Sequence, residues 1–218
     1  MQQPLRLLGR HGTLMLLLFF FLNAPSLYAG DGNALANGNT CYESCGLAGK
    51  LNREAFNKAY LKAISKGKDL DRMAVIDFTL PSTKQRLFII DLQSKKLLYS
   101  GLVAHGKGSG EVMAVNFSNV PESHQSSAGL YRIGSKIVSP KHGDALLLEG
   151  LEKGLNDNAK KREIILHAAD YVSEDFMKSH GRCGRSFGCP AVSPRDLQFI
   201  LQLLREGDLL YVYTDLHS

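Results

Sequence analysis

Two cysteines lie six residues apart in a stretch rich in glycine and arginine near the end of the chain. The stretch reads GRCGRSFGCPAV over residues 181–192 and contains Cys183 and Cys189. A thiol can act as a nucleophile, form half of a disulfide or bind zinc. An ordinary thiol is mostly protonated at neutral pH, so a nucleophilic cysteine needs a base or positive charge nearby.

The neighbours of Cys189 favour a nucleophile. Gly188 lets the backbone approach a substrate closely and can turn an amide toward a developing oxyanion. Ser186 can add a hydroxyl donor, and two flanking arginines add positive charge. His167 ends the apolar run EIILHAA, where a buried strand would deliver its imidazole to the rim of a sheet. We therefore interpret Cys189 and His167 as a nucleophile and its base.

Three other interpretations of this loop stay open. Cys183 and Cys189 can form a disulfide in an oxidising compartment. A zinc site would combine His180 and the two cysteines, with His167 as a further candidate ligand, although structural sites more often use paired C-x₂-C spacing. His180 is also a rival base. It follows a predicted helix rather than a strand, so His167 is preferred.

The first 29 residues have the layout of an export signal. Arg6 and Arg10 precede nine apolar residues, Leu14–Leu22, and small residues lead to a cut site after Ala29. A retained membrane anchor is the alternative, but nine residues are far fewer than the roughly 20 that span a bilayer. We expect export to the periplasm or cell envelope, with membrane attachment only if the segment is retained.

The exported chain would carry little net charge and all four cysteines. Removal of residues 1–29 lowers the formal charge from +5 to +3, because the segment contains two arginines and no acid. Such a charge does not indicate nucleic-acid binding. The four thiols permit three complete pairings, and Cys41 and Cys45 are compatible with a bond to each other or with no role.

The pattern of apolar residues around the cysteine loop predicts a mainly β domain with flanking helices. Residues 30–49, rich in Gly and Asn, are interpreted as a flexible lead-in, and residues 50–218 as one domain that opens with a helix capped by Asn52. Six apolar runs follow without intervening helices, which favours an antiparallel sandwich or barrel. The runs are MAVIDFTL, RLFIIDL, KLLYSGLVA, GLYRIGSKIV, DALLLEGL and REIILHAA.

The last part of the chain predicts two helices around the cysteine loop. Ser173 caps a short helix, and Ser193 with Pro194 begins another. A final strand, DLLYVYT, follows. Residues 105–128 form a long stretch without strand pattern, and such stretches in compact domains are usually functional or disordered.

The motif SFGCPAV, preceded by a run ending in IILHAADYV, resembles the catalytic domain of the L,D-transpeptidase family. The signature of that family is a histidine at a strand end followed by Ser-x-Gly-Cys. LFIIDLQSKKLLYSGLVAHGKGSG is similar to its opening hairpin, and SSAGLYRIG to its strand of small, glycine and aromatic residues. The resemblance covers about residues 50–214 and is nearest to a bacterial murein subgroup with the ending Gly-Arg-Ser-x-Gly-Cys-Pro.

The resemblance implies an exported enzyme that acts on peptidoglycan stem peptides without a cofactor or metal. In the family, a cysteine attacks the carbonyl at the L-centre of the third residue, expels the terminal D-alanine and passes the acyl group to an amine. Carried over, Cys189 is the nucleophile and His167 its base, and the main chain near Ala168 orients the imidazole. Ser186 and the backbone at Gly188 and Cys189 lie where the oxyanion is stabilised.

The chain departs from the family pattern around the motif. Ala168 stands where a glycine usually follows the histidine. Ala191 stands two positions after the cysteine, where family members commonly have a basic residue. Phe187 stands where many members have a polar residue. Other side chains would then hold the substrate. The candidates are Arg182, Arg185 and Tyr171, with Arg195 as a further arginine.

Two other functions remain compatible with these residues. Water in place of the amine would make the protein an L,D-carboxypeptidase or related hydrolase, since the acceptor is chosen by the shape of a second cleft. A disulfide between Cys183 and Cys189 would instead suit a non-catalytic wall-binding module.

Overall fold

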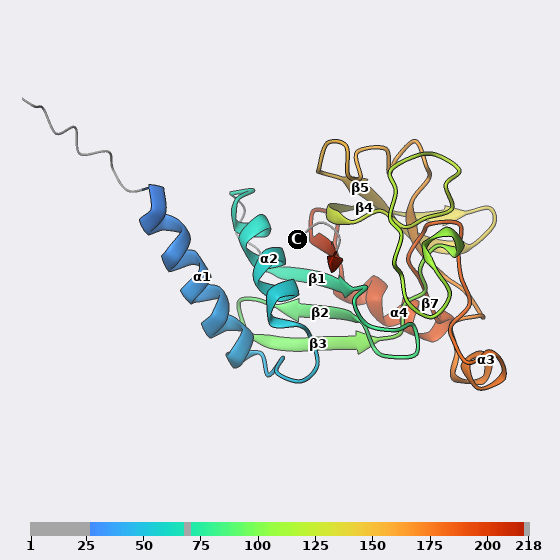
Figure 1. The fold of residues 1–218 in the computed structure, drawn as a ribbon, viewed down its shortest axis with the longest axis horizontal. Coiled ribbons are helices and arrows are strands. Elements are labelled where there is room, and N and C mark those ends of the chain that lie inside the picture. Colours follow the sequence, from blue (N-terminus) through green and yellow to red (C-terminus); the bar gives the residue numbers. More distant parts are fainter. Residues whose placement is uncertain (1–26, 68–70, 216–218) are drawn as a thin grey trace, which may run out of the picture.

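The computed structural model describes residues 27–67 and 71–215. Within these residues, helices flank one curled sheet (Figure 1). The helices are α1 (Leu27–Ser44), α2 (Arg53–Ile64), α3 (Glu174–His180) and α4 (Pro194–Leu203). The strands are β1 (Arg72–Asp77), β2 (Leu87–Asp91), β3 (Lys96–Gly101), β4 (Gly129–Ser139), β5 (Gly143–Gly150), β6 (Ile165–Ala168), β7 (Ala191–Val192) and β8 (Leu209–Tyr213).

The sheet has the order β3-β2-β1-β8-β4-β5-β6-β7. The expected fold class, mainly β with flanking helices, is confirmed. The sheet is mixed, however, because β8 lies parallel to β1 and β7 parallel to β6. The β6–β7 pair needs a crossover, which α3 supplies, and β7 has too few residues to show an alternating pattern in the sequence. The expectation of an antiparallel sheet throughout is therefore wrong at these two pairs.

The two edges of the sheet meet next to the cysteine loop. Ala104, just after edge strand β3, forms an antiparallel bridge with Ala191 in edge strand β7. The Ala104 N–H donates to the Ala191 carbonyl at 2.8 Å, and the reverse bond is 3.4 Å long. A second bridge joins Gly106 to Ser186. The long segment 105–128 is thereby held against the cysteine loop.

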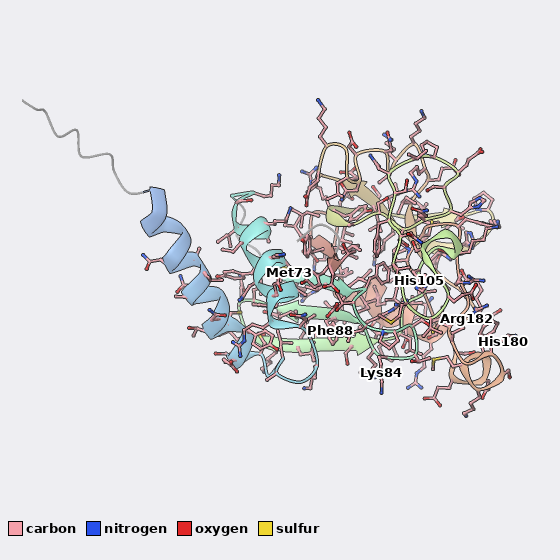
Figure 2. The ribbon with its side chains drawn as sticks, in the orientation of Figure 1. Met73, Lys84, Phe88, His105, His180 and Arg182 are labelled. Atoms are coloured by element: carbon pink, nitrogen blue, oxygen red, sulfur yellow. The ribbon has the colours of Figure 1, made fainter. Side chains whose placement is uncertain are left out.

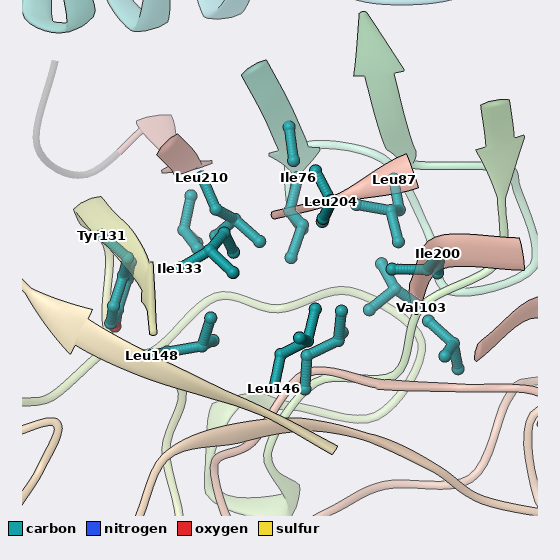
Figure 3. Close-up of a cluster of buried hydrophobic side chains, with 14 of the residues drawn as sticks. Ile76, Leu87, Val103, Tyr131, Ile133, Leu146, Leu148, Ile200, Leu204 and Leu210 are labelled. Carbon is teal, nitrogen blue, oxygen red and sulfur yellow. The ribbon is translucent and has the colours of Figure 1, made fainter. Parts of the chain in front are cut away.

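Strand β1 is buried on both faces of the sheet. Its residues Ala74 and Ile76 belong to a cluster inside the curl, which α4 completes with Ile200 (Figure 3). The alternate residues Met73 and Val75 belong to a second cluster under α1 and α2. This alternation follows from the opposite directions of successive side chains in a strand.

The predicted helix starts are confirmed by their caps. The Asn52 side chain accepts a hydrogen bond from the Glu54 N–H at 2.8 Å, which begins α2. The hydroxyls of Ser173 and Ser193 do the same at the starts of α3 and α4. These bonds satisfy N–H groups that the first turn of a helix leaves unpaired.

The expected flexible lead-in over residues 30–49 is wrong, because α1 extends to Ser44. Tyr42 is buried, and its hydroxyl donates to the Leu51 carbonyl at 2.7 Å. Its ring contacts that of Phe56 with 5.6 Å between centroids. Packing on α2 thus overrides the poor helix propensity of Gly and Asn. Figure 1 shows α1 beside α2, at one end of the molecule.

The predicted export signal lies mostly in residues 1–26, outside the described residues. Among the residues that are described, no helix combines the length and apolar character needed to cross a membrane.

Replacing Tyr42 with Ala tests the docking of α1. We expect a loss of about 3 kcal/mol in the free energy of unfolding, because a buried aromatic ring is removed. The measurement is a urea titration. The control Thr40→Ala removes an exposed side chain of the same helix and should change stability by about 0.5 kcal/mol or less. Equal stability of the two variants would contradict the packing.

Candidate active site

The Ser186 hydroxyl shapes the turn that carries Cys189. Its oxygen accepts a hydrogen bond from the Gly188 N–H at 3.0 Å, and its hydrogen is donated to the Cys189 carbonyl at 2.5 Å. Of the three groups that were expected to face an oxyanion, the Ser186 hydroxyl and the Gly188 N–H are thus used inside the loop. Within the described residues the Cys189 N–H has no acceptor, so this amide is the donor left for a ligand.

The backbone at Gly188 requires glycine. Its φ is +128°, a conformation that L side chains rarely adopt. An added Cβ would lie 2.9 Å from the Gln125 carbonyl oxygen and 3.0 Å from Nη2 of Arg162. Close contact of three chain segments therefore excludes a side chain immediately before Cys189.

Segment 105–128 supports the cysteine loop, so it is an ordered part of the site. The Ser126 hydroxyl accepts from the Gly106 N–H at 3.0 Å and donates to the Gly188 carbonyl at 3.1 Å. The Ser186 N–H donates to the His105 carbonyl at 3.0 Å. One hydroxyl thus joins the two loops from both sides.

His167 lies next to the segment that follows Cys189. It is 1% exposed, and its Cα pairs with that of Ala191 in the β6–β7 register. The ring nitrogen Nδ1 lies 2.8 Å from the Ala168 carbonyl oxygen. A carbonyl can only accept, so Nδ1 carries the hydrogen and Nε2 keeps its lone pair. The main chain at Ala168 orients the imidazole as a base, in agreement with the sequence-based expectation.

Burial keeps both reactive groups neutral. It is the main reason why the pKa of His167 falls from 6.5 to about 4; the hydrogen bond to Ala168 opposes this change, and the nearby His142 and Lys141 contribute to it. Burial also raises the pKa of the Cys189 thiol, against smaller opposing effects of the Ile165 N–H and of two cations. Burial therefore favours the neutral thiol at Cys189 and the neutral imidazole at His167.

Arg162 is a site residue that the sequence did not indicate. Its guanidinium donates to the carbonyl of Ser118 at 2.7 Å and also to Ser127 and Gln125. Its charge opposes the rise of the Cys189 pKa. In the sequence it ends the run Lys-Lys-Arg, which is typical of a solvated surface.

His142 and Lys141 also approach the site from an unexpected element. They lie in the turn between β4 and β5. The His142 ring lies against the His167 ring, with 3.9 Å between centroids. A turn far away in the sequence thus covers the proposed base, and no local pattern could have indicated it.

The two arginines that were expected to bind substrate are engaged with Glu111. Arg182 Nε lies 3.0 Å from one carboxylate oxygen of Glu111, and Arg185 Nη1 lies 2.6 Å from the other. Their positive charge is therefore balanced by segment 105–128.

Tyr171 lies beside the cysteine loop, because a Cβ added at Gly184 would meet its side chain at 2.4 Å. Burial raises the pKa of the Tyr171 phenol to about 12. Its main-chain carbonyl accepts from the Gly184 N–H at 2.8 Å, which ties it to the cysteine loop.

The rival arrangements of the loop residues are not brought together. His180 is exposed at the end of α3, on the outer edge of the molecule (Figure 2), and stacks on Phe176 with 4.0 Å between ring centroids. Cys183 is buried and its thiol donates to the Ser82 carbonyl at 3.0 Å. All four cysteines are free thiols. In the described part of the chain, no three acidic, histidine or cysteine side chains form a group that could hold a metal.

A buried Arg86–His105 pair anchors the start of segment 105–128. Both side chains are fully buried, and Arg86 Nη2 donates to His105 Nδ1 at 2.7 Å. The opposite nitrogen, Nε2, lies 3.2 Å from the Gly110 carbonyl oxygen and donates to it. Burial, with the adjacent Arg86 charge, lowers the pKa of His105 from 6.5 to about 4.

A family model described as the L,D-transpeptidase catalytic domain matches residues 47–213. No curated protein sequence matches the chain. The solved structures that it resembles include an L,D-transpeptidase from Mycobacterium smegmatis, with 13% identity and a TM-score of 0.41, over 66% of this chain and 59% of that chain. An L,D-transpeptidase from Stackebrandtia nassauensis has 16% identity and a TM-score of 0.41, over 83% and 78% of the two chains.

The likeness to these structures is distant, and this chain spans less than two thirds of the first one. The family model, by contrast, covers about three quarters of the sequence, including the cysteine loop and β6.

Replacing Gly188 with Ala should cost about 2–4 kcal/mol of folding free energy, because a strained φ and two close contacts combine. The matched control is Gly154→Ala, where φ is also positive at +79° but nothing lies within 4 Å of the added Cβ. For Gly154→Ala we expect a loss of about 1 kcal/mol in folding free energy. Urea unfolding measures both, and equal losses would contradict the crowding at Gly188.

Acid should destabilise the fold through His105. The pKa of this group is lower in the folded protein than in the unfolded chain, so the unfolded state takes up the proton first. Its stabilising contribution is complete above pH 6.5 and is lost as the pH falls from 6.5 to about 4. His105→Gln keeps an acceptor for Arg86 but cannot be protonated. Over this pH range its free energy of unfolding should therefore fall by about 3 kcal/mol less than that of the wild type.

The measurement is the free energy of unfolding in urea at pH 7 and pH 4.5. The control His180→Gln changes an exposed histidine and should behave as the wild type does. An unchanged pH dependence in His105→Gln would rule out the buried neutral imidazole.

Proposed function

The chain belongs to the L,D-transpeptidase catalytic domain family, and we propose that it is an exported enzyme that transfers peptidoglycan stem peptides through a thioester at Cys189. Family membership supports peptidoglycan-modifying transpeptidase activity. Export is proposed from Arg6, Arg10 and the apolar run Leu14–Leu22, and it would bring the enzyme to the cell wall.

The observation that carries the proposal is the hydrogen bond from His167 Nδ1 to the Ala168 carbonyl. It leaves Nε2 as a base on β6, beside the short strand that begins two residues after Cys189. A third group that fixes the tautomer of a base next to a nucleophile is the general arrangement of catalytic triads.

In the first half-reaction, the Cys189 sulfur attacks the carbonyl carbon at the L-centre of the third stem residue. The thiol proton passes to His167 Nε2, and the developing oxyanion faces the Cys189 N–H. The C–N bond to the terminal D-alanine then breaks. The leaving amine takes the proton from the imidazole, and a thioester remains.

In the second half-reaction, an acceptor amine attacks the thioester carbonyl. The new C–N bond forms as the C–S bond breaks, and a proton of the amine returns through His167 to the sulfur. Neutral resting groups suit this cycle, because His167 is unprotonated at neutral pH and ready to accept the proton. Water in the place of the amine would give hydrolysis instead.

Cys189→Ala should abolish turnover of a tetrapeptide-bearing muropeptide, because no other group can form the thioester. Cys183→Ala is the matched control, since Cys183 is a buried thiol in the same loop with its own partner, and it should retain activity. Product analysis by mass spectrometry follows D-alanine release and cross-linked dimers. In the same samples, a carbapenem should leave one adduct on the peptide that contains Cys189.

The products separate the possible reactions. Cross-linked dimers support transfer, whereas shortened monomers alone would make the protein a carboxypeptidase. Full activity of Cys189→Ala would rule out the nucleophile. Absence of turnover and adduct, with a mass two hydrogens lower across Cys183 and Cys189, would favour the wall-binding module.

A further inference from the structure

An exposed aromatic ring lies two residues before Cys189. Phe187 is 56% exposed, although its neighbours Ser186 and Gly188 are buried. A single exposed apolar side chain is common on protein surfaces, so the groups that surround this ring decide whether it has a role.

Three other segments bring charged or aromatic groups to this ring. Lys107 Nζ lies 4.3 Å from the ring centroid, and Lys141 Nζ lies 5.3 Å from it. The two ammonium nitrogens are therefore at most 9.6 Å apart, the sum of these distances. The His124 ring packs on Phe187 with 4.8 Å between centroids. Two like charges are thus held close together, which favours a bound anion.

Within the part of the chain that the structure describes, no carboxylate pairs with either lysine. In the described residues, neither Lys107 nor Lys141 forms a salt bridge, whereas Arg182 and Arg185 share Glu111. The positive charge of Lys141 reaches the site, since it acts on both Cys189 and His167. Within the described residues, Lys107, Lys141 and Arg162 therefore carry charge without a carboxylate partner, whereas the arginines of the motif share Glu111.

We propose that Lys107 and Lys141, on either side of Phe187, bind the terminal carboxylate of the acyl-donor peptide. The assignment rests on the proposed function for the identity of the ligand. In that donor the carboxylate carbon is three bonds from the carbonyl carbon that Cys189 attacks. The cation that binds it must lie next to the nucleophile, and the Phe187 ring offers an apolar contact for the D-alanine methyl group.

The first test of the anion site measures alkylation of Cys189 and needs no catalytic activity. Iodoacetate and iodoacetamide both alkylate Cys189, but only iodoacetate carries a carboxylate. We use the ratio of the iodoacetate rate to the iodoacetamide rate, measured on the peptide that contains Cys189. This ratio reports the local positive charge, because a change in thiol reactivity alters both rates equally. In Lys107→Met and Lys141→Met the ratio should fall about three- to tenfold. Met keeps a long apolar stem against Phe187.

The matched control is Lys96→Met, which removes an exposed lysine at the start of β3. Its ratio should equal that of the wild type. Added salt should shrink the difference between wild type and the two site variants, because the lysines are partly screened. An unchanged ratio in both site variants would overturn the anion site, whether or not the protein is a transpeptidase.

The donor assignment is tested with two tetrapeptide donors, one with a free terminal carboxylate and one with a terminal carboxamide. Wild type should prefer the free carboxylate, and each lysine variant should reduce this preference about three- to tenfold, mainly through KM. A changed alkylation ratio with an unchanged donor preference would overturn the assignment to this carboxylate. Loss of activity in Cys189→Ala remains the separate test of the proposed function.

Discussion

The pairing of Ala104 with Ala191 is the contact on which the site depends. It joins the two edges of the sheet, so the chain after β3 runs along the chain after Cys189. Main-chain bonds between His105 and Ser186 and the bridging Ser126 hydroxyl extend this pairing toward the nucleophile. Because the edges are joined, neither presents a long row of unpaired N–H and C=O groups there. The same closure places a reactive thiol on backbone that is held from both sides.

Burial determines the electrostatic state of the site. It lowers the pKa of His167 and raises that of Cys189, and both changes favour the neutral forms. A neutral pair costs less to bury than an ion pair, which would have to offset the desolvation of two charges. Positive charge therefore reaches Cys189 only from the surroundings. Arg162, held by carbonyl groups of segment 105–128, and Lys141, on the turn between β4 and β5, both act on Cys189 from outside the motif.

Some cations near the cysteine loop are paired with a carboxylate, and others in the described residues are not. Arg182 and Arg185 share the carboxylate of Glu111 and so tie the loop to segment 105–128. The arginines that are closest to Cys189 in sequence thus have a structural partner. Lys107 and Lys141 come from elements that are distant in sequence, and they meet only because both pack on Phe187. Proximity in the chain was therefore a poor guide to which cations near the loop lack a carboxylate partner in the described residues.

The sequence by itself determined what depends on a few neighbouring residues. The caps at Asn52, Ser173 and Ser193, most strands, and the place of His167 near the end of a buried strand were all predictable, because turns, caps and alternation act over a few positions. Only the tertiary structure decided that residues 27–44 are helical, that β7 lies parallel to β6, and that His142, Lys141 and Arg162 reach the site. Each of these depends on contacts between segments far apart in the chain, whose free energy exceeds local propensity and leaves no periodic pattern in the sequence.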